Sequence, residues 1–238
     1  MKVVLASGNK NKLREIGEIW GDSVEIISQA SLGIEDGPEE NGEDFRDNAL
    51  IKVRFVKERT DLPVIADDSG LVIDALGGEP GVHSARFLGE DTPYDVKMKE
   101  IISRMSGKTG VYRSARFVCS AVCIMDDGTV LERTGTINGC IGYGMAGSNG
   151  FGYDPLFFID PFDAARAFEI SGMSRDEAER LALRLGEENL VTGAVRADLK
   201  EYVSTAQLPP DVKDAVSHRG RAFRSLLRDI LAAGVRVS

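Results

Sequence analysis

The sequence is poor in the residues that build zinc sites and disulfide frameworks. Its 238 residues include three cysteines and two histidines, and no CxxC pair occurs. Cys119 and Cys123 would share one face of an expected strand about 13 Å apart, too far for a disulfide. We therefore expect reduced thiols, no zinc site and a reducing, cytoplasmic setting.

Excess basic charge and long apolar runs are also missing. The formal net charge is −9, which argues against the broad polyanion-binding surface of a duplex nucleic-acid reader. A local basic pocket for one phosphorylated ligand is still allowed. No apolar run approaches the length of a membrane span, and residues 1–5 lead into an expected strand rather than a signal peptide. We predict neither a nucleic-acid nor a membrane partner.

Strands alternate with helical periodicities along the chain, which indicates an α/β fold. Strands are expected at 2–6, 24–28, 64–66, 115–125 and 129–137. The last two flank Asp126-Asp127-Gly128, a strong hairpin signal, so the sheet should be mixed. The length suits one well-buried domain or two small ones.

The short apolar run 64–66 leads into Asp67 and Asp68, followed by Ser69 and Gly70. Neighbouring side chains on a strand point to opposite faces, so the two carboxylates should diverge. A buried charge needs a partner, and Mg²⁺ suits one or two carboxylates plus substrate phosphates. The alternative is a strand followed by a solvated turn, with Gly70 at positive φ. This stretch alone leaves both interpretations open.

The polar loop at residues 7–12 joins the first strand to a helix, where amide groups and the helix dipole favour anions. Its spacing is not that of the GxxxxGK[ST] phosphate loop. The alternative is an N-cap with solvated lysines. The acidic stretch 35–44 likewise reads as a solvated loop ending in a helix cap at Asn41.

Two further stretches could bind a ligand. Residues 147–155 set aromatic side chains between glycines, which suits stacking of a flat ring, although the aromatics could instead plug the core. A basic cluster precedes the final helix of this acidic protein and is a candidate anion site. It consists of Lys213, His218 and Arg219.

Six segments together resemble one family, the inosine/xanthosine triphosphate pyrophosphatases, which remove non-standard purine nucleotides. Each motif alone is weak, but all six occur in the family's order. The resemblance covers residues 1–161 and about 204–234. The segments are residues 7–12, 40–49, 66–71, 81–86, 150–155 and 217–220.

The resemblance implies that a purine nucleoside triphosphate (ITP, dITP or XTP) and water give the monophosphate and pyrophosphate. It also implies Mg²⁺ as cofactor and a homodimer. The implied fold is an elongated, two-lobed single domain spanning residues 1–238. Its mixed twisted sheet has flanking helices and a central cleft.

The family's functional residues map onto matching positions of this sequence. Asp68 matches the metal-binding catalytic base and Glu40 its metal partner, which overturns the solvated-loop interpretation of residues 35–44. The triphosphate would be held by Ser7, Gly8, Asn9, Lys10, Asn11, Lys12, Lys52 and Ser69. The base would be framed by Phe151, Gly152, Tyr153, Asp154, Lys213, His218 and Arg219.

The chain departs from the family at residues 162–204, where it carries an apparent helical insertion. Ser174 should cap a helix that Gly186 ends, and a second short helix is expected near 195–202. Helices this short must bury an apolar face to be stable. We hypothesise that the insertion lies beside the substrate mouth or along the subunit interface, with neutral decoration as the alternative.

Two other functions are considered. One is a pyrophosphatase for modified pyrimidine nucleotides on a related fold, against which the match at His218 and Arg219 argues. The other is a nucleotide sensor without turnover, against which retention of the acidic residues and Lys12 argues. A panel of triphosphates with and without Mg²⁺ separates all three.

Overall fold

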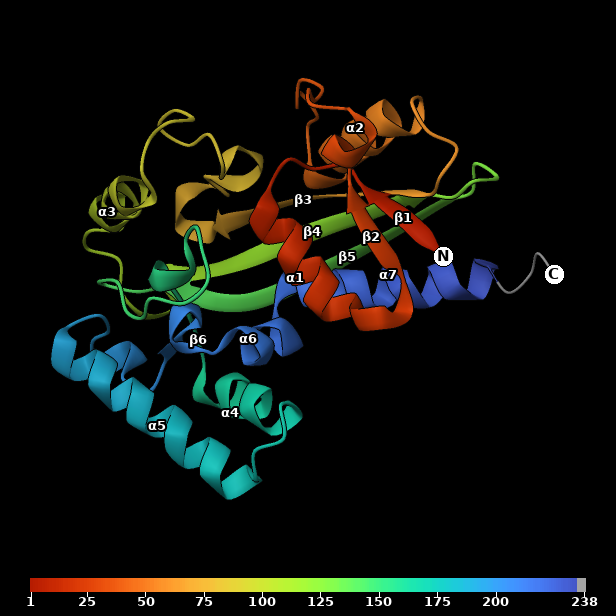
Figure 1. The fold of residues 1–238 in the computed structure, drawn as a ribbon. Coiled ribbons are helices and arrows are strands. Elements are labelled where there is room, and N and C mark those ends of the chain that lie inside the picture. Colours follow the sequence, from red (N-terminus) through yellow and green to blue (C-terminus); the bar gives the residue numbers. More distant parts are fainter. Residues whose placement is uncertain (235–238) are drawn as a thin grey trace. The chain divides into compact units, whose positions relative to one another are not determined.

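The computed structural model describes residues 1–234, which form a seven-stranded sheet in the order β2-β1-β3-β4-β5-β6-β7 (Figure 1). β1 pairs in parallel with β2 and β3, whereas β6 pairs antiparallel with β5 and β7. The predicted mixed α/β sheet is therefore confirmed. The strands are β1 (Lys2–Leu5), β2 (Glu25–Ser28), β3 (Val64–Ile73), β4 (Ser114–Ile124), β5 (Val130–Ile141), β6 (Phe157–Ile159) and β7 (Val203–Ser204).

Helices flank the sheet, and the predicted hairpin is confirmed because adjacent strands β4 and β5 join through a turn closed by Met125 N–H donating to Thr129 O. Within residues 1–234, no helix has both the length and the apolar character that a bilayer crossing requires. The helices are α1 (Lys10–Trp20), α2 (Phe45–Lys57), α3 (Tyr94–Arg104), α4 (Pro161–Ile170), α5 (Arg175–Thr192), α6 (Pro210–Val216) and α7 (His218–Gly234).

The chain forms two compact units, each assembled from separate stretches of sequence. The first unit comprises Met1–Ser69, Val118–Thr136 and the chain from Ser217 onward. The second unit comprises Gly70–Phe117 and Ile137–Val216. Strands β3, β4 and β5 each contribute residues to both units.

In the first unit, the alternation of β3 assigns its residues to two different cores. Ile65 packs in a cluster with Trp20 of α1 and Phe223 of α7, whose rings meet edge to face at 5.8 Å. Val64 and Ala66 instead join the cluster that contains the apolar side chains of α2. Helices α1 and α7 therefore cover one face of the strands and α2 covers the other (Figure 1).

The carboxylates lie within β3, not at its end. The strand continues to Ile73, and Gly70 is not among the residues with positive φ in the described chain. The alternative of a solvated turn after residue 66 is therefore wrong. The strand can continue through two acids because each carboxylate has cationic partners, so neither is buried alone. The three cysteines are free and buried.

The second unit has its own core around β5, β6 and α3, with Phe117 and Phe157 rings 4.6 Å apart. Residues 162–204 bury part of their apolar surface here. Phe168 of α4 and Ala182 of α5 lie in this core, and Leu181 and Leu185 pack against it half-buried. Leu199 is buried in a smaller cluster of the same unit.

Gly186 does not end its helix, contrary to the prediction. Helix α5 continues to Thr192 and stops at Gly193, whose φ of 77° is left-handed. A Cβ at Gly186 would lie 2.6 Å from the backbone oxygen of Glu201, so the glycine permits a close approach of chain segments. The short helix expected near 195–202 is also wrong, because only a 3₁₀ turn forms at Ala197–Leu199 before β7 begins.

Candidate active site

Asp67 faces the α1 and α7 side of β3 and is fully buried among cations. Its Oδ1 lies 3.0 Å from Lys12 Nζ, and its Oδ2 lies 3.4 Å from Arg219 Nε. Ser69 Oγ donates to the same Oδ2 at 2.7 Å. Burial alone would raise the pKa of this carboxyl, but Lys12 and Arg219 outweigh that effect and hold it well below its usual range. Asp67 therefore stays ionised and anchors the cations around it.

Asp68 points to the opposite, α2 side of the strand. Lys52 Nζ donates to Oδ1 at 3.0 Å and Asn48 Nδ2 donates to Oδ2 at 3.3 Å. Burial raises the pKa of Asp68 and outweighs the opposing effect of Lys52, while the nearby Glu40 carboxylate raises it further. A carboxylate with a raised pKa is the better proton acceptor. The pKa values of the two adjacent acids are thus shifted in opposite directions, that of Asp67 downward and that of Asp68 upward.

Glu40 shares the ammonium of Lys52 with Asp68, at 3.4 Å from its Oε2 to Nζ. Two carboxylates therefore converge on one cationic group. Among residues 1–234, no three His, Cys, Asp or Glu side chains gather closely enough to hold a metal alone. Two carboxylates completed by substrate phosphates are a donor set that suits Mg²⁺. The residues present thus fit a cation that protein and substrate hold together.

Asn48 connects the acidic loop to this centre, a role that the sequence analysis missed. Its Oδ1 accepts the Gly42 amide at 2.8 Å, while its Nδ2 reaches Asp68. The helix cap is Asp44, whose carboxylate accepts from Asp47 N at 2.8 Å, so the expectation of a cap at Asn41 is wrong. The signal was present, since Asn48 follows the cap by one helical turn on the buried face.

Residues 7–9 lead into α1 and residues 10–12 form its first turn, so the loop lies at the helix N-terminus as expected. Asn9 caps the helix, with its Oδ1 accepting from the amides of Asn11 at 2.9 Å and Lys12 at 3.4 Å. Ser7 Oγ accepts from the Asn9 amide at 3.1 Å. Because Asn9 already uses two helix-start amides, an anion bound here would depend more on the side chains of Lys10 and Lys12.

In the second unit, Asp154 organises the aromatic loop, which we define as residues 150–154. Its Oδ2 accepts from Phe151 N at 2.8 Å and Lys213 Nζ at 2.7 Å, and the Lys213 ammonium lies 5.1 Å from the Phe151 ring centroid. Tyr153 is 3% exposed and donates its hydroxyl to Ser84 O at 2.9 Å. Tyr153 therefore plugs the core, whereas Phe151 is only half-buried.

The residues expected to frame the base divide between the units. Residues 151–154 and Lys213 belong to the second unit, and His218 and Arg219 to the first. Both of the latter are buried at the start of α7. Arg219 donates to Glu15 as well as to Asp67, so its guanidinium neutralises two buried carboxylates. These carboxylates outweigh the effect of burial and raise the pKa of Arg219.

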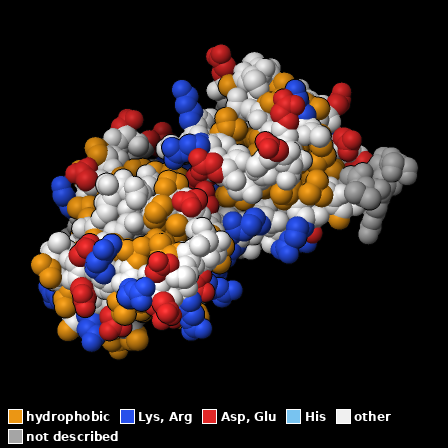
Figure 2. All heavy atoms as spheres, turned by 60° about the horizontal axis from the view of Figure 1, so that its bottom comes forward, with side chains coloured by type: hydrophobic (Ala, Val, Ile, Leu, Met, Phe, Trp, Pro, Cys, Tyr) orange, Lys and Arg blue, Asp and Glu red, His pale blue; other side chains and the backbone are white. Residues whose placement is uncertain are grey.

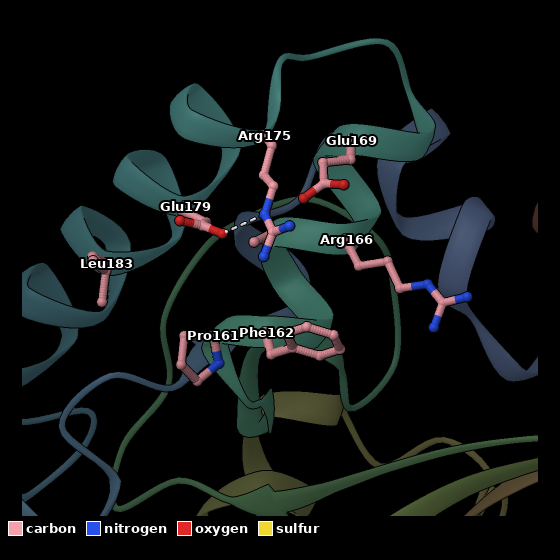
Figure 3. Close-up of a pocket in the computed structure, with 8 residues that line it drawn as sticks. Pro161, Phe162, Arg166, Glu169, Arg175, Glu179 and Leu183 are labelled. Atoms are coloured by element: carbon pink, nitrogen blue, oxygen red, sulfur yellow. Dashed lines mark hydrogen bonds and ion pairs between the residues drawn. The ribbon is translucent and has the colours of Figure 1, made fainter.

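A groove of about 590 Å³ lies between α4 and α5 (Figure 3), and none of the residues that line it is predicted for the site. Arg175 Nε on its rim is 2.9 Å from Glu179 Oε1. Acidic, basic and apolar side chains intermingle over α4 and α5, at the lower left of Figure 2. The groove is lined by Pro161, Phe162, Ala165, Arg166, Glu169, Arg175, Glu179 and Leu183.

Comparison with known proteins agrees with the resemblance in the sequence. The model of the Ham1 family matches residues 3–184. The chain belongs to the Ham1 family. A dITP/XTP pyrophosphatase of Shigella flexneri is 39% identical to this Ham1 protein over 229 residues, covering 95% of this chain and 96% of the relative.

Two further matches bear on the length and fold of this Ham1 protein. The structure of a HAM1 protein from Coxiella burnetii superposes with a TM-score of 0.73 at 29% identity, covering 98% of this chain and 99% of that one. A dITP/XTP pyrophosphatase of Haemophilus influenzae is 42% identical over 160 residues, which are 66% of this chain but 82% of the relative. That relative is the shorter protein, as an insertion in this chain would require.

Proposed function

We propose that this Ham1 protein hydrolyses non-standard purine nucleoside triphosphates, namely ITP, dITP and XTP, to the monophosphate and pyrophosphate. The observation that carries the proposal is the pair of buried carboxylates on opposite faces of β3, each 3.0 Å from a lysine ammonium and with pKa values shifted in opposite directions. The names of relatives such as the Shigella protein support the substrate class.

Asp68 is the proposed general base. Water attacking the α-phosphorus must lose a proton, and a carboxylate whose pKa burial has raised accepts it more readily. Lys12 and Lys52 supply positive charge for the developing negative charge of the triphosphate. Asp67 keeps Lys12 in place, since the ammonium lies within 3.0 Å of its carboxylate.

Mg²⁺ belongs to the same proposal, with Glu40 and Asp68 as its protein ligands. When bound, it would neutralise phosphate charge and orient the triphosphate. The shared contact of both carboxylates with Lys52 supports a cationic position there. A homodimer, expected from the resemblance, is also proposed, and solution scattering measures it.

Selectivity for the base is assigned to the aromatic loop and the basic residues. A half-buried Phe151 ring offers a stacking surface, and Lys213 supplies a donor beside it. Donors directed at a 6-keto oxygen favour hypoxanthine and xanthine, because the exocyclic amine of adenine would leave them unpaired. His218 and Arg219 belong to this proposal through the family's motif.

The test is a panel of ITP, dITP, XTP, ATP and methylated pyrimidine triphosphates, with and without Mg²⁺, in which pyrophosphate and orthophosphate are measured separately. We expect Mg²⁺-dependent pyrophosphate from the first three. Orthophosphate as the primary product would refute the reaction. Preferred turnover of the pyrimidines would favour the second enzyme function, and tight binding without turnover would indicate a sensor.

A further inference from the structure

Helix α3 brings a side chain that no motif singled out against the aromatic loop. Tyr94, the first residue of α3, meets Tyr153 edge to face, with ring centroids 5.1 Å apart and planes at 85°. A Cβ built on Gly152 would lie 3.6 Å from Cε1 of the Tyr94 ring. Tyr94 and the aromatic loop both belong to the second unit, so this packing is a feature of one compact body.

Tyr94 and Tyr153 differ in their exposure and in the hydrogen bonding of their hydroxyl groups. Tyr153 is 3% exposed and its hydroxyl is satisfied by Ser84 O. Tyr94 is 37% exposed, and no hydrogen bond of its hydroxyl is found among residues 1–234. The Tyr94 ring is therefore partly exposed beside the aromatic loop, and the described part of the fold provides no hydrogen bond to its hydroxyl. These properties suit a side chain that contacts a ligand better than one that only fills the core.

Lys97 stabilises the position of Tyr94 by placing its ammonium against the Tyr94 ring. The Lys97 side chain is 1% exposed, its ammonium lies 5.0 Å from the Tyr94 ring centroid, and it donates to Ala85 O at 2.5 Å. The arrangement repeats that of Lys213 with Phe151. Two rings, each backed by a buried lysine, therefore occur beside Gly152. A cation against one ring orients it without occupying its exposed edge.

We propose that Tyr94 is a further specificity residue, whose ring contacts the purine base beside Gly152 and whose hydroxyl donates to the base edge. This inference rests on the proposed function and adds a residue outside the six motifs. Burial and the nearby Asp154 carboxylate raise the pKa of Tyr94, so the phenol remains a neutral donor near pH 7. Stacking tolerates any base, whereas the donor favours a base with an acceptor at that edge.

The test compares Tyr94→Ala, Tyr94→Phe and the control Tyr112→Ala, which removes a 67% exposed tyrosine from the same unit. KM and kcat are measured with XTP and ITP, and inorganic tripolyphosphate serves as a base-free competitive inhibitor. Tyr94→Ala should raise KM about tenfold, the scale of one lost aromatic stack, with kcat changed less than about twofold. Tyr94→Phe should keep most of the affinity for XTP and ITP, but it should reduce the preference of the enzyme for these substrates over ATP.

The inhibitor separates contact from structural damage. If Tyr94 touches the base, the inhibition constant of tripolyphosphate should not change in Tyr94→Ala, because that ligand has no base. An equal loss for nucleotide and tripolyphosphate, an unchanged KM, or the same loss in Tyr112→Ala would each overturn the inference. A wild-type protein that releases no pyrophosphate from any purine triphosphate would instead refute the proposed function, and the inference with it.

Discussion

The two units hold their polar groups in different ways. In the first unit, Asp67 and Asp68 are buried, and each carboxylate contacts at least one full positive charge, from Lys12 and Arg219 or from Lys52. In the second unit, one ion pair between Asp154 and Lys213 orders a loop whose other members are rings and glycines. The first arrangement sets protonation states, and the second sets shape. Catalysis and base recognition should therefore respond to different variants.

The difference also has an energetic side. Removing one member of a buried charge group leaves its partner unpaired, which costs several kcal/mol. Removing Lys213 leaves the Asp154 carboxylate, which is 4% exposed, with the Phe151 amide and the Thr205 hydroxyl still donating to it. We expect variants of Asp67, Asp68 and their lysines to change turnover or stability, and variants of the second unit to change KM and selectivity, to which His218 and Arg219 of the first unit are also assigned.

The largest effect on turnover should come from Asp68→Asn, which removes the proposed base but keeps the shape of the side chain. Turnover of XTP should fall by roughly 10²-fold or more, measured as pyrophosphate release. Asp67→Asn is the paired variant, because Asp67 is the carboxylate whose pKa is held low. Near-normal turnover in Asp68→Asn together with loss in Asp67→Asn would reverse the assignment.

Arg219→Met should mainly lower stability, because it leaves Glu15 and Asp67 without the guanidinium that both contact. We expect a loss of about 3–5 kcal/mol at pH 7 in urea unfolding. Since the folded-state pKa of Asp67 is depressed, the wild-type advantage should be present above about pH 4 and shrink as the pH falls further.

Arg221→Met is the matched control for Arg219→Met. Arg221 lies two residues further along α7, is exposed, and donates to the Thr136 carbonyl at 2.9 Å. Its removal should change stability by less than about 0.5 kcal/mol. Equal losses of unfolding free energy in the two variants would show that the buried contacts of Arg219 stabilise the protein no more than an exposed arginine does.

Lys213→Met tests the second unit. The ammonium donates to Asp154 and lies beside the Phe151 ring, so its loss should weaken binding of the base. KM for XTP and ITP should rise about tenfold, with kcat less affected, and discrimination against ATP should narrow. Lys200→Met, an exposed lysine of the same unit, is the control. A kcat loss as large as that of Asp68→Asn would contradict the division between the units.

The smallest shift should appear in the pH dependence. It is judged from the position of the profile on the pH axis, because Lys52→Met also removes a proposed phosphate contact and lowers the activity at every pH. Lys52 opposes the rise that burial causes in the pKa of Asp68, so Lys52→Met should raise that pKa further. Activity requires the ionised base, and the acidic limb of kcat/KM should therefore move to higher pH, by roughly one unit. Arg54→Met, an exposed change on the same helix, should leave the limb in place. A shift toward lower pH would exclude Asp68 as the titrating base.

The sequence by itself determined the fold class, and it identified the candidate residues through the resemblance of six motifs to a known family. Alternating strands and helical periodicities gave the mixed α/β sheet, and Asp126-Asp127-Gly128 gave the hairpin. The divergence of Asp67 and Asp68 followed from the two-residue period of a strand. These features depend on neighbours in the chain, which is why a pattern is enough to find them.

The tertiary structure alone decided which group partners which. The pKa of Asp67 is lowered because Lys12 and Arg219 lie on one face of β3, whereas that of Asp68 is raised because Lys52 on the other face does not outweigh burial. These three cationic residues are far apart in sequence. Gly186 was predicted to end a helix, because the local pattern does not show the backbone of Glu201, 15 residues away, that requires a glycine there. Asn48 and Tyr94 were missed likewise. Partners, burial and close approaches are set by packing between distant segments, and local propensity does not contain them.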